Sequence, residues 1–165
     1  MEEPNVIRQS DEVVVRQTIN WKSAILAGII AGAVFMMLEM IMVPLFMPEG
    51  SPWGPPRMIA AIGMGKEVLP PPATFALIPM MVAMVIHFIL SIIYAIILAL
   101  IINRFGLGIA ILIGAIFGLV LYLINFYGFT AIFPWFAMGR NWISIFSHIV
   151  FGAVAAWAYK TLARS

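Results

Sequence analysis

Four long apolar stretches, separated by shorter polar segments, dominate the pattern along this chain. Each stretch is uncharged or nearly so, and each approaches or exceeds the about 20 residues that an α-helix needs to cross a bilayer. The pattern predicts an all-α membrane protein, a bundle of four transmembrane helices within residues 22–160. The expected spans are, in order, about 23–47, 75–103, 105–133 and 141–160.

The polar segments indicate how the bundle is oriented. Residues 1–21 lack the basic start and short apolar core of a signal peptide, so they and residues 161–165 are expected to be cytoplasmic tails. Six Lys and Arg residues lie on the side of the termini and three on the other side, which favours cytoplasmic termini. The first group is Arg8, Arg16, Lys22, Arg104, Lys160 and Arg164, and the second is Arg57, Lys66 and Arg140.

Composition excludes several classes of protein. The 165 residues are 64% hydrophobic and 10% charged, with mean hydropathy +1.08, far from the usual soluble mixture. A net charge of +2 is too small for a nucleic-acid surface, so no nucleic-acid partner is expected. Without cysteine the chain alone carries no disulfide, thiolate zinc site or iron–sulfur cluster.

Four polar side chains interrupt the apolar stretches, namely Glu39, His87, Asn125 and His148. A carboxylate near the bilayer centre costs about 2.5 to 3.5 kcal/mol on insertion scales, so an intramembrane acid is a candidate functional site. Helical spacing places Glu39, Asn125 and His148 in the outer half of the membrane, with His87 deeper. One hypothesis is a protonatable cluster in which Glu39 and the histidines exchange a proton. The other is a static hydrogen bond between the first and fourth spans.

Small residues and polar residues recur with a common spacing. Aligning Gly28-x-x-x-Gly32 with Gly114-x-x-x-Gly118 places Glu39 opposite Asn125, and both intramembrane histidines are followed four residues later by a small residue. The spacing predicts two repeated helical hairpins in the same orientation. Small faces are typical of helix–helix contacts in membranes. The expected packing residues are Gly28, Gly32, Gly114, Gly118 and Gly152.

The outer loop, residues 48–74, is rich in proline. Pro56 is expected to begin a short helix that runs to Met64, and the segment 69–75 is expected to be extended. Such a loop forms a lid over the bundle or a docking surface for a partner. The candidate docking residues are Trp53, Arg57 and Arg140.

Known catalytic and metal-binding patterns are missing from the sequence. It contains no Gly-x-Ser-x-Gly, phosphate loop or His-Glu-x-x-His, so no enzymatic activity is expected. Met80, Met84 and His87 follow one helical face and are candidate ligands for Cu(I). Methionine also fills irregular gaps between helices. No metal or cofactor is predicted. Haem between His87 and His148, a quinone and copper remain as alternatives.

Three segments around the outer loop carry a resemblance. The three segments are Glu39-Met-Ile-Met-Val-Pro-Leu-Phe, Gly50-Ser-Pro-Trp-Gly-Pro-Pro-Arg-Met-Ile-Ala-Ala61 and Val68-Leu-Pro-Pro-Pro-Ala-Thr-Phe75. They resemble segments of a group of small uncharacterised bacterial four-helix membrane proteins. Some of those relatives carry the label sodium:proline symporter. The resemblance, over about residues 22–160, implies a topology and the bacterial cytoplasmic membrane, and it assigns no activity.

Two functions follow as expectations. The first is a non-catalytic accessory subunit that packs against a larger membrane complex, such as an energy-converting or respiratory one, because the chain has apolar helices and no large domain outside the membrane. The second is a small self-associating transporter or channel that uses Glu39 and the histidines to move protons or a solute. Both expect the lipid bilayer, other membrane subunits or further copies of the chain as partners.

Overall fold

Every regular element that the structure describes is helical. The computed structural model describes residues 18–69, 71 and 73–163. Four helices are long and apolar enough to span a membrane: α1 (Trp21–Phe46), α3 (Leu77–Ile102), α4 (Leu107–Leu123) with its continuation to Ala131, and α5 (Trp142–Leu162). The predicted four-helix membrane bundle is therefore confirmed. Most of the predicted N-terminal tail and the last two residues of the C-terminal tail lie outside the described residues.

The third span is not the continuous helix that its hydropathy predicted. After Leu123 the chain forms a wider π-helical turn, Ile124–Gly128, and then a 3₁₀ turn, Phe129–Ala131. A side chain 14 residues further along the chain stabilises this turn. Arg140 donates a hydrogen bond from Nε to the carbonyl oxygen of Phe126 at 2.8 Å, and so binds an acceptor inside the wide turn.

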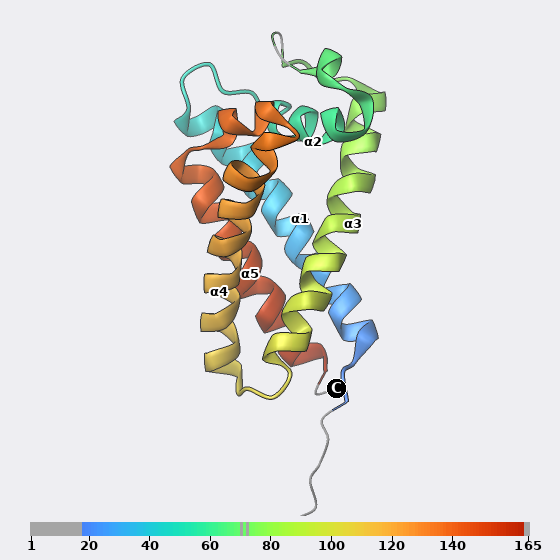
Figure 1. The fold of residues 1–165 in the computed structure, drawn as a ribbon, viewed down its shortest axis with the longest axis vertical. Coiled ribbons are helices and arrows are strands. Elements are labelled where there is room, and N and C mark those ends of the chain that lie inside the picture. The colour runs from blue at the N-terminus through green and yellow to red at the C-terminus, as the bar shows by residue number, and fades with distance from the viewer. Residues whose placement is uncertain (1–17, 70, 72, 164–165) are drawn as a thin grey trace, which may run out of the picture.

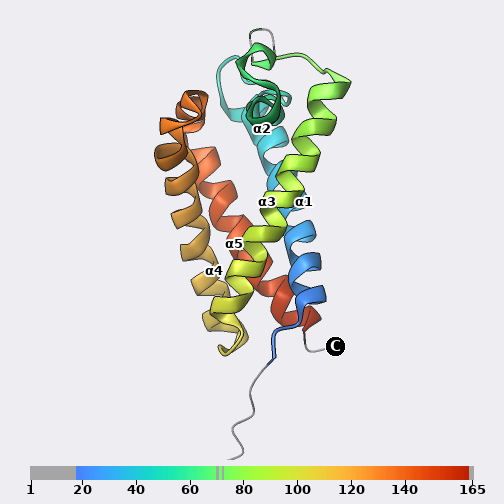
Figure 2. The ribbon, with the colours of Figure 1, turned by 45° about the vertical axis from the view of Figure 1, so that its right-hand side comes forward.

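The loop between the first two spans contains α2 (Gly54–Met64), which begins two residues before the predicted Pro56. Figures 1 and 2 show α2 lying crosswise over one end of the bundle, here called the α2 end. Arg57 fixes it to the following turn by hydrogen bonds to the carbonyl oxygens of Val68 and Thr74. In the expected extended segment 69–75, Pro70 and Pro72 lie outside the described residues.

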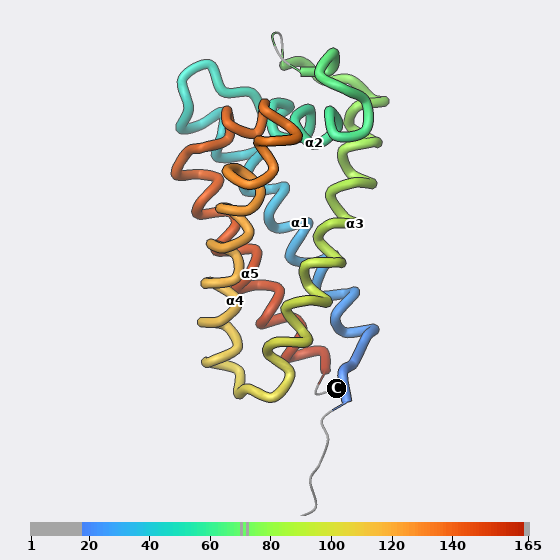
Figure 3. The backbone as a smooth tube through the Cα atoms, in the orientation of Figure 1, coloured from blue at the N-terminus to red at the C-terminus, as the bar shows by residue number. Residues whose placement is uncertain are grey.

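The spanning helices pack in the order α3, α1, α5, α4. Extensive contacts join α3 to α1, α1 to α5 and α5 to α4, whereas α3 has only sparse contacts with α4. Figure 2 shows α3 and α4 close together at the turn that joins them and apart at the α2 end. The tube in Figure 3 follows the same two hairpins, α1 with α3 and α4 with α5, which run in the same direction.

Residue size explains why the bundle is closed at one end and wider at the other. Alanine dominates the core toward the end that lacks α2, where Ala27, Ala99 and Ala158 are buried, so the helix axes approach closely. Toward the α2 end a separate cluster is built from large rings, including Tyr122, Phe126 and Phe136. Large side chains hold the helices further apart there.

Glycines form the contact within each hairpin. A methyl group on Gly32 would meet the Ser91 side chain at 2.7 Å, and one on Gly118 would overlap the carbonyl oxygen of His148. Gly28, Gly114 and Gly152 are equally tight against the partner helix of their own hairpin. The two hairpins thus use equivalent positions for packing, because Ser91 and Gly152 each lie four residues after a buried histidine.

Ile, Leu, Met and Phe side chains cover the outward faces of the four spans, where many are more than 40% exposed. Exposed apolar surface of this extent is stable only in contact with lipid or protein. The chain is therefore a multi-pass membrane protein whose outer surface contacts the bilayer.

Candidate functional site: a cavity between the two hairpins

A cavity of about 640 Å³ lies between the hairpins at the α2 end. All four spanning helices, α2 and the irregular segment after α4 contribute to its wall. Its volume falls in the range of small-molecule sites, roughly 300 to 1,000 Å³. The lining includes exposed residues such as Glu49 and Met138, so the cavity reaches the surface of the molecule.

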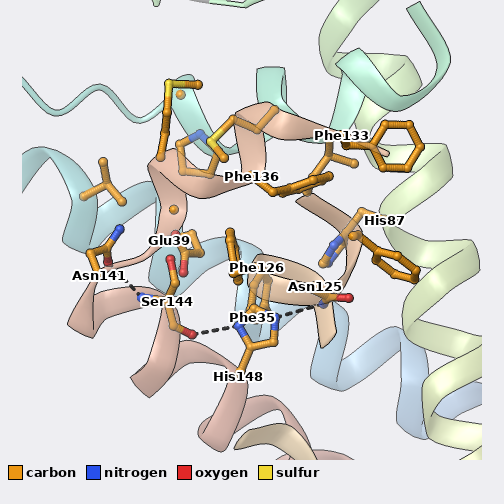
Figure 4. Close-up of a pocket in the computed structure, with 18 of the residues that line it drawn as sticks. Phe35, Glu39, His87, Asn125, Phe126, Phe133, Phe136, Asn141, Ser144 and His148 are labelled. Carbon is orange, nitrogen blue, oxygen red and sulfur yellow. Dashed lines mark hydrogen bonds between the residues drawn. The ribbon is translucent and has the colours of Figure 1, made fainter. Parts of the chain in front are cut away.

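A directed chain of hydrogen bonds crosses the cavity wall from α3 to α5. The Tyr94 hydroxyl donates to Asn125 Oδ1 at 3.2 Å, and Asn125 Nδ2 lies 3.2 Å from His148 Nε2. Figure 4 shows the part of this chain from Asn125 through His148 to Ser144. His148 Nδ1 lies 2.7 Å from the Ser144 carbonyl oxygen, which can only accept. His148 is therefore the Nδ1-protonated neutral tautomer, and its Nε2 accepts from Asn125.

The π-helical turn positions Asn125 in this chain of bonds. Both Asn125 and Phe126 belong to the wide turn, and Arg140 binds the turn from outside the cavity. A Cβ on Gly139 would overlap the ring of Phe126, so only glycine lets this ring pack there. Single π-turns inside helices occur frequently at functional sites.

His87 belongs to the same wall but makes a different bond. Its Nε2 lies 2.8 Å from the carbonyl oxygen of Gly32, so Nε2 carries the proton and donates to α1. The Phe35 ring lies between the two histidines, stacked on His87 and edge-on to His148. A haem held by both histidines would have to break these hydrogen bonds.

Glu39 projects from α1 into the cavity and is only 5% exposed. Ser144 and Ser147 of α5 lie against its carboxyl group, yet Glu39 Oε1 and Ser147 Oγ are buried without a hydrogen-bond partner. Both ring nitrogens of His148 are bonded to residues other than Glu39, namely Asn125 and the Ser144 carbonyl group. A buried carboxylate oxygen without a partner is costly, so a proton or a bound partner at Oε1 would stabilise this group.

The cavity brings together the four predicted polar residues Glu39, His87, Asn125 and His148. It also contains residues that sequence reasoning missed, notably Tyr94, Ser144 and Glu49. Glu49 is exposed at the mouth, where its φ of 58° is rare for a residue other than glycine. The Pro48-Glu49-Gly50 sequence indicates a turn, but only the fold places that turn beside the cavity.

The three predicted docking residues all have partners within the chain. The ring centroids of Trp53 and Phe75 lie 5.0 Å apart, and Arg57 donates a hydrogen bond to the Val68 carbonyl oxygen in the loop after α2. Arg140 lies 4.3 Å from the centre of the Tyr127 ring, in addition to its bond to Phe126. Their positions are explained by local structure, and docking stays a prediction.

Comparison with known proteins yields no match to a protein family, a curated protein or a solved structure. The fold and the cavity nevertheless define a class: an α-helical multi-pass membrane protein with a partly polar cavity inside its transmembrane bundle.

Proposed function

We propose that this protein is a small membrane transporter that takes up a small amphipathic molecule between its two hairpins. The observation that carries the proposal is the cavity itself, which is large enough for a ligand and contains a buried carboxyl oxygen without a partner. A purely structural bundle of apolar helices gains no stability from such a cavity or from such an acid.

A transporter is favoured over an open channel because the cavity reaches only one end of the bundle and does not pass through it. Its lining belongs to the α2 end, whereas the opposite end is closed by fully buried residues such as Ala99 and Ile102. Two hairpins in parallel orientation are a known basis for alternating access, in which one half rocks against the other. The extensive α1–α5 contact would act as the pivot, while the short turn 103–106 keeps α3 and α4 joined at the closed end.

The accessory-subunit hypothesis remains as a prediction. The outward apolar faces that would contact a larger complex are equally suited to lipid. On the resemblance to small bacterial four-helix proteins and the distribution of Lys and Arg, we also propose the bacterial cytoplasmic membrane with both termini inside.

The absence of cysteine from the sequence makes an accessibility experiment clean, since the unsubstituted chain gives no labelling. Leu90→Cys places a thiol in the cavity wall, and Ala99→Cys places one in the closed end of the same helix. In proteoliposomes, a membrane-impermeant maleimide should label Leu90→Cys from the α2 side and Ala99→Cys from the opposite side. Leu100→Cys, on the lipid-facing side, controls for reagent that enters the bilayer.

Labelling of Ala99→Cys from the opposite side, without labelling of Leu100→Cys, demonstrates a second state of the bundle. If Ala99→Cys reacts only after denaturation, while Leu90→Cys reacts in the native protein, the bundle is static and the transport proposal is wrong. Native gel filtration of each variant confirms that it is folded before labelling.

A further inference from the structure

The charged residues that line the cavity are all acidic. Among the residues that the structure describes, Glu39 and Glu49 line the cavity, and no Lys or Arg does. Arg140, which lies between the lining residues Gly139 and Asn141 in the sequence, instead binds the Phe126 carbonyl group and the Tyr127 ring. A cavity with acids and no bases attracts positive charge, and apolar walls of low dielectric strengthen that attraction.

The hydrogen-bonding capacity of the wall agrees with the charge. The donor groups of this wall already have acceptors. Along the chain of hydrogen bonds, Tyr94 donates to Asn125, Asn125 to His148, and His148 to the Ser144 carbonyl oxygen. His87 donates to the Gly32 carbonyl oxygen. The buried oxygen without a partner, Glu39 Oε1, is an acceptor when ionised. A ligand that complements this wall therefore supplies a donor or a positive charge.

Aromatic rings form much of the remaining surface. Seven aromatic residues line the cavity, in a set drawn from α1, α3, α5 and the segment between α4 and α5. Figure 4 shows several of these rings around the space above Asn125 and His148. The faces of such rings attract cations at about 0.5 to 2 kcal/mol each, and they also accommodate apolar groups.

Granting the transport function proposed above, we propose that the ligand is a lipophilic organic cation, such as an amine, ammonium or phosphonium ion with aromatic or alkyl groups. The cation pairs with Glu39 inside the membrane, while its apolar groups contact the aromatic wall. Glu49 at the mouth raises the local concentration of cations before they enter.

Tetraphenylphosphonium tests this assignment, because triphenylphosphine oxide offers a neutral aromatic probe and tetraphenylborate an anion of the same shape. Binding of each radiolabelled probe is measured by equilibrium dialysis of the purified protein in detergent, with empty micelles as the blank. The variants are Glu39→Gln, which removes the charge, Leu90→Trp, which fills the cavity, and Ile89→Trp. Ile89 is 53% exposed on the adjacent outward face and is the matched control for added bulk.

The expected result is saturable binding of tetraphenylphosphonium that Glu39→Gln weakens at least about tenfold, with the neutral probe changed by less than about twofold. Leu90→Trp should abolish binding of the phosphonium, and Ile89→Trp should leave it unchanged. Unchanged binding of the neutral probe also shows that Glu39→Gln is folded.

Two other outcomes overturn different statements. If the neutral or anionic probe binds as well as the cation and Glu39→Gln changes none of them, the cation assignment is wrong while the cavity still binds ligands. If no probe binds saturably, or if Leu90→Trp leaves binding intact, both the cation assignment and the proposed uptake of a ligand between the hairpins are wrong.

Discussion

Gly118→Ala tests the close approach of α4 and α5, on which the position of His148 depends. A methyl group at this position would overlap the His148 carbonyl oxygen and lie 2.7 Å from its carbonyl carbon, whereas ordinary van der Waals contact begins at 3.4 Å. Both obstructing atoms belong to the backbone, so no side chain can rotate away. The helices must separate by roughly 1 Å, which forfeits about a quarter to a half of each local dispersion contact.

Overpacking of this kind costs about 1 to 3 kcal/mol. Ala is also a better helix former than Gly by about 1 kcal/mol, and that gain would hide part of the cost. Gly108→Ala corrects for it, because Gly108 lies in the same helix and a Cβ there meets nothing within 4 Å. We expect Gly118→Ala to be less stable than Gly108→Ala by about 1 to 3 kcal/mol.

The measurement is unfolding in mixed micelles with increasing dodecyl sulfate, followed by tryptophan fluorescence. Gly32→Ala provides an internal ranking, since its methyl group would meet the Ser91 side chain rather than backbone. It should therefore cost less than Gly118→Ala. Equal stability of the Gly118→Ala and Gly108→Ala variants, or a larger loss in Gly32→Ala, would refute the reasoning.

Three further substitutions test contacts that shape the cavity. Asn125→Leu removes both side-chain hydrogen bonds of Asn125 and should lower the free energy of unfolding by about 1 to 2 kcal/mol in the same unfolding measurement. Arg140→Gln removes the bond to the Phe126 carbonyl, and hydrogen exchange of amides in the π-helical turn should become faster. Trp135→Phe removes a 3.1 Å bond to α2, so amides of α2 should exchange faster while the unfolding midpoint shifts little.

Much of the architecture could be predicted because hydropathy acts locally. Each spanning helix satisfies its own backbone hydrogen bonds in lipid, so length and apolarity alone locate it to within a few residues. The break after Leu123 was missed because the apolar stretch continues beyond it, although residues 124–131 are less apolar than the helix before them and include Asn125, Gly128 and Thr130. The contact between Arg140 and the Phe126 carbonyl oxygen could not be predicted, because a chain reversal separates the two residues.

The candidate site was only partly accessible to sequence reasoning. An acid and two histidines within apolar stretches are conspicuous, because their burial in lipid is costly. Which of them bind each other depends on the rotation and separation of the helices. Asn125, rather than Glu39, bonds with His148, and this leaves Glu39 Oε1 without a partner.

The sequence by itself determined that this chain crosses a membrane four times and that few polar groups lie within the spans, because both follow from the free energy of transferring side chains into lipid. It also contained the two matching small-residue patterns that bring the helices of each hairpin together. Only the tertiary structure decided that small residues close one end of the bundle while large rings widen the other. A difference in helix separation, produced by contacts between distant residues, created the cavity and left the Glu39 carboxyl group facing it.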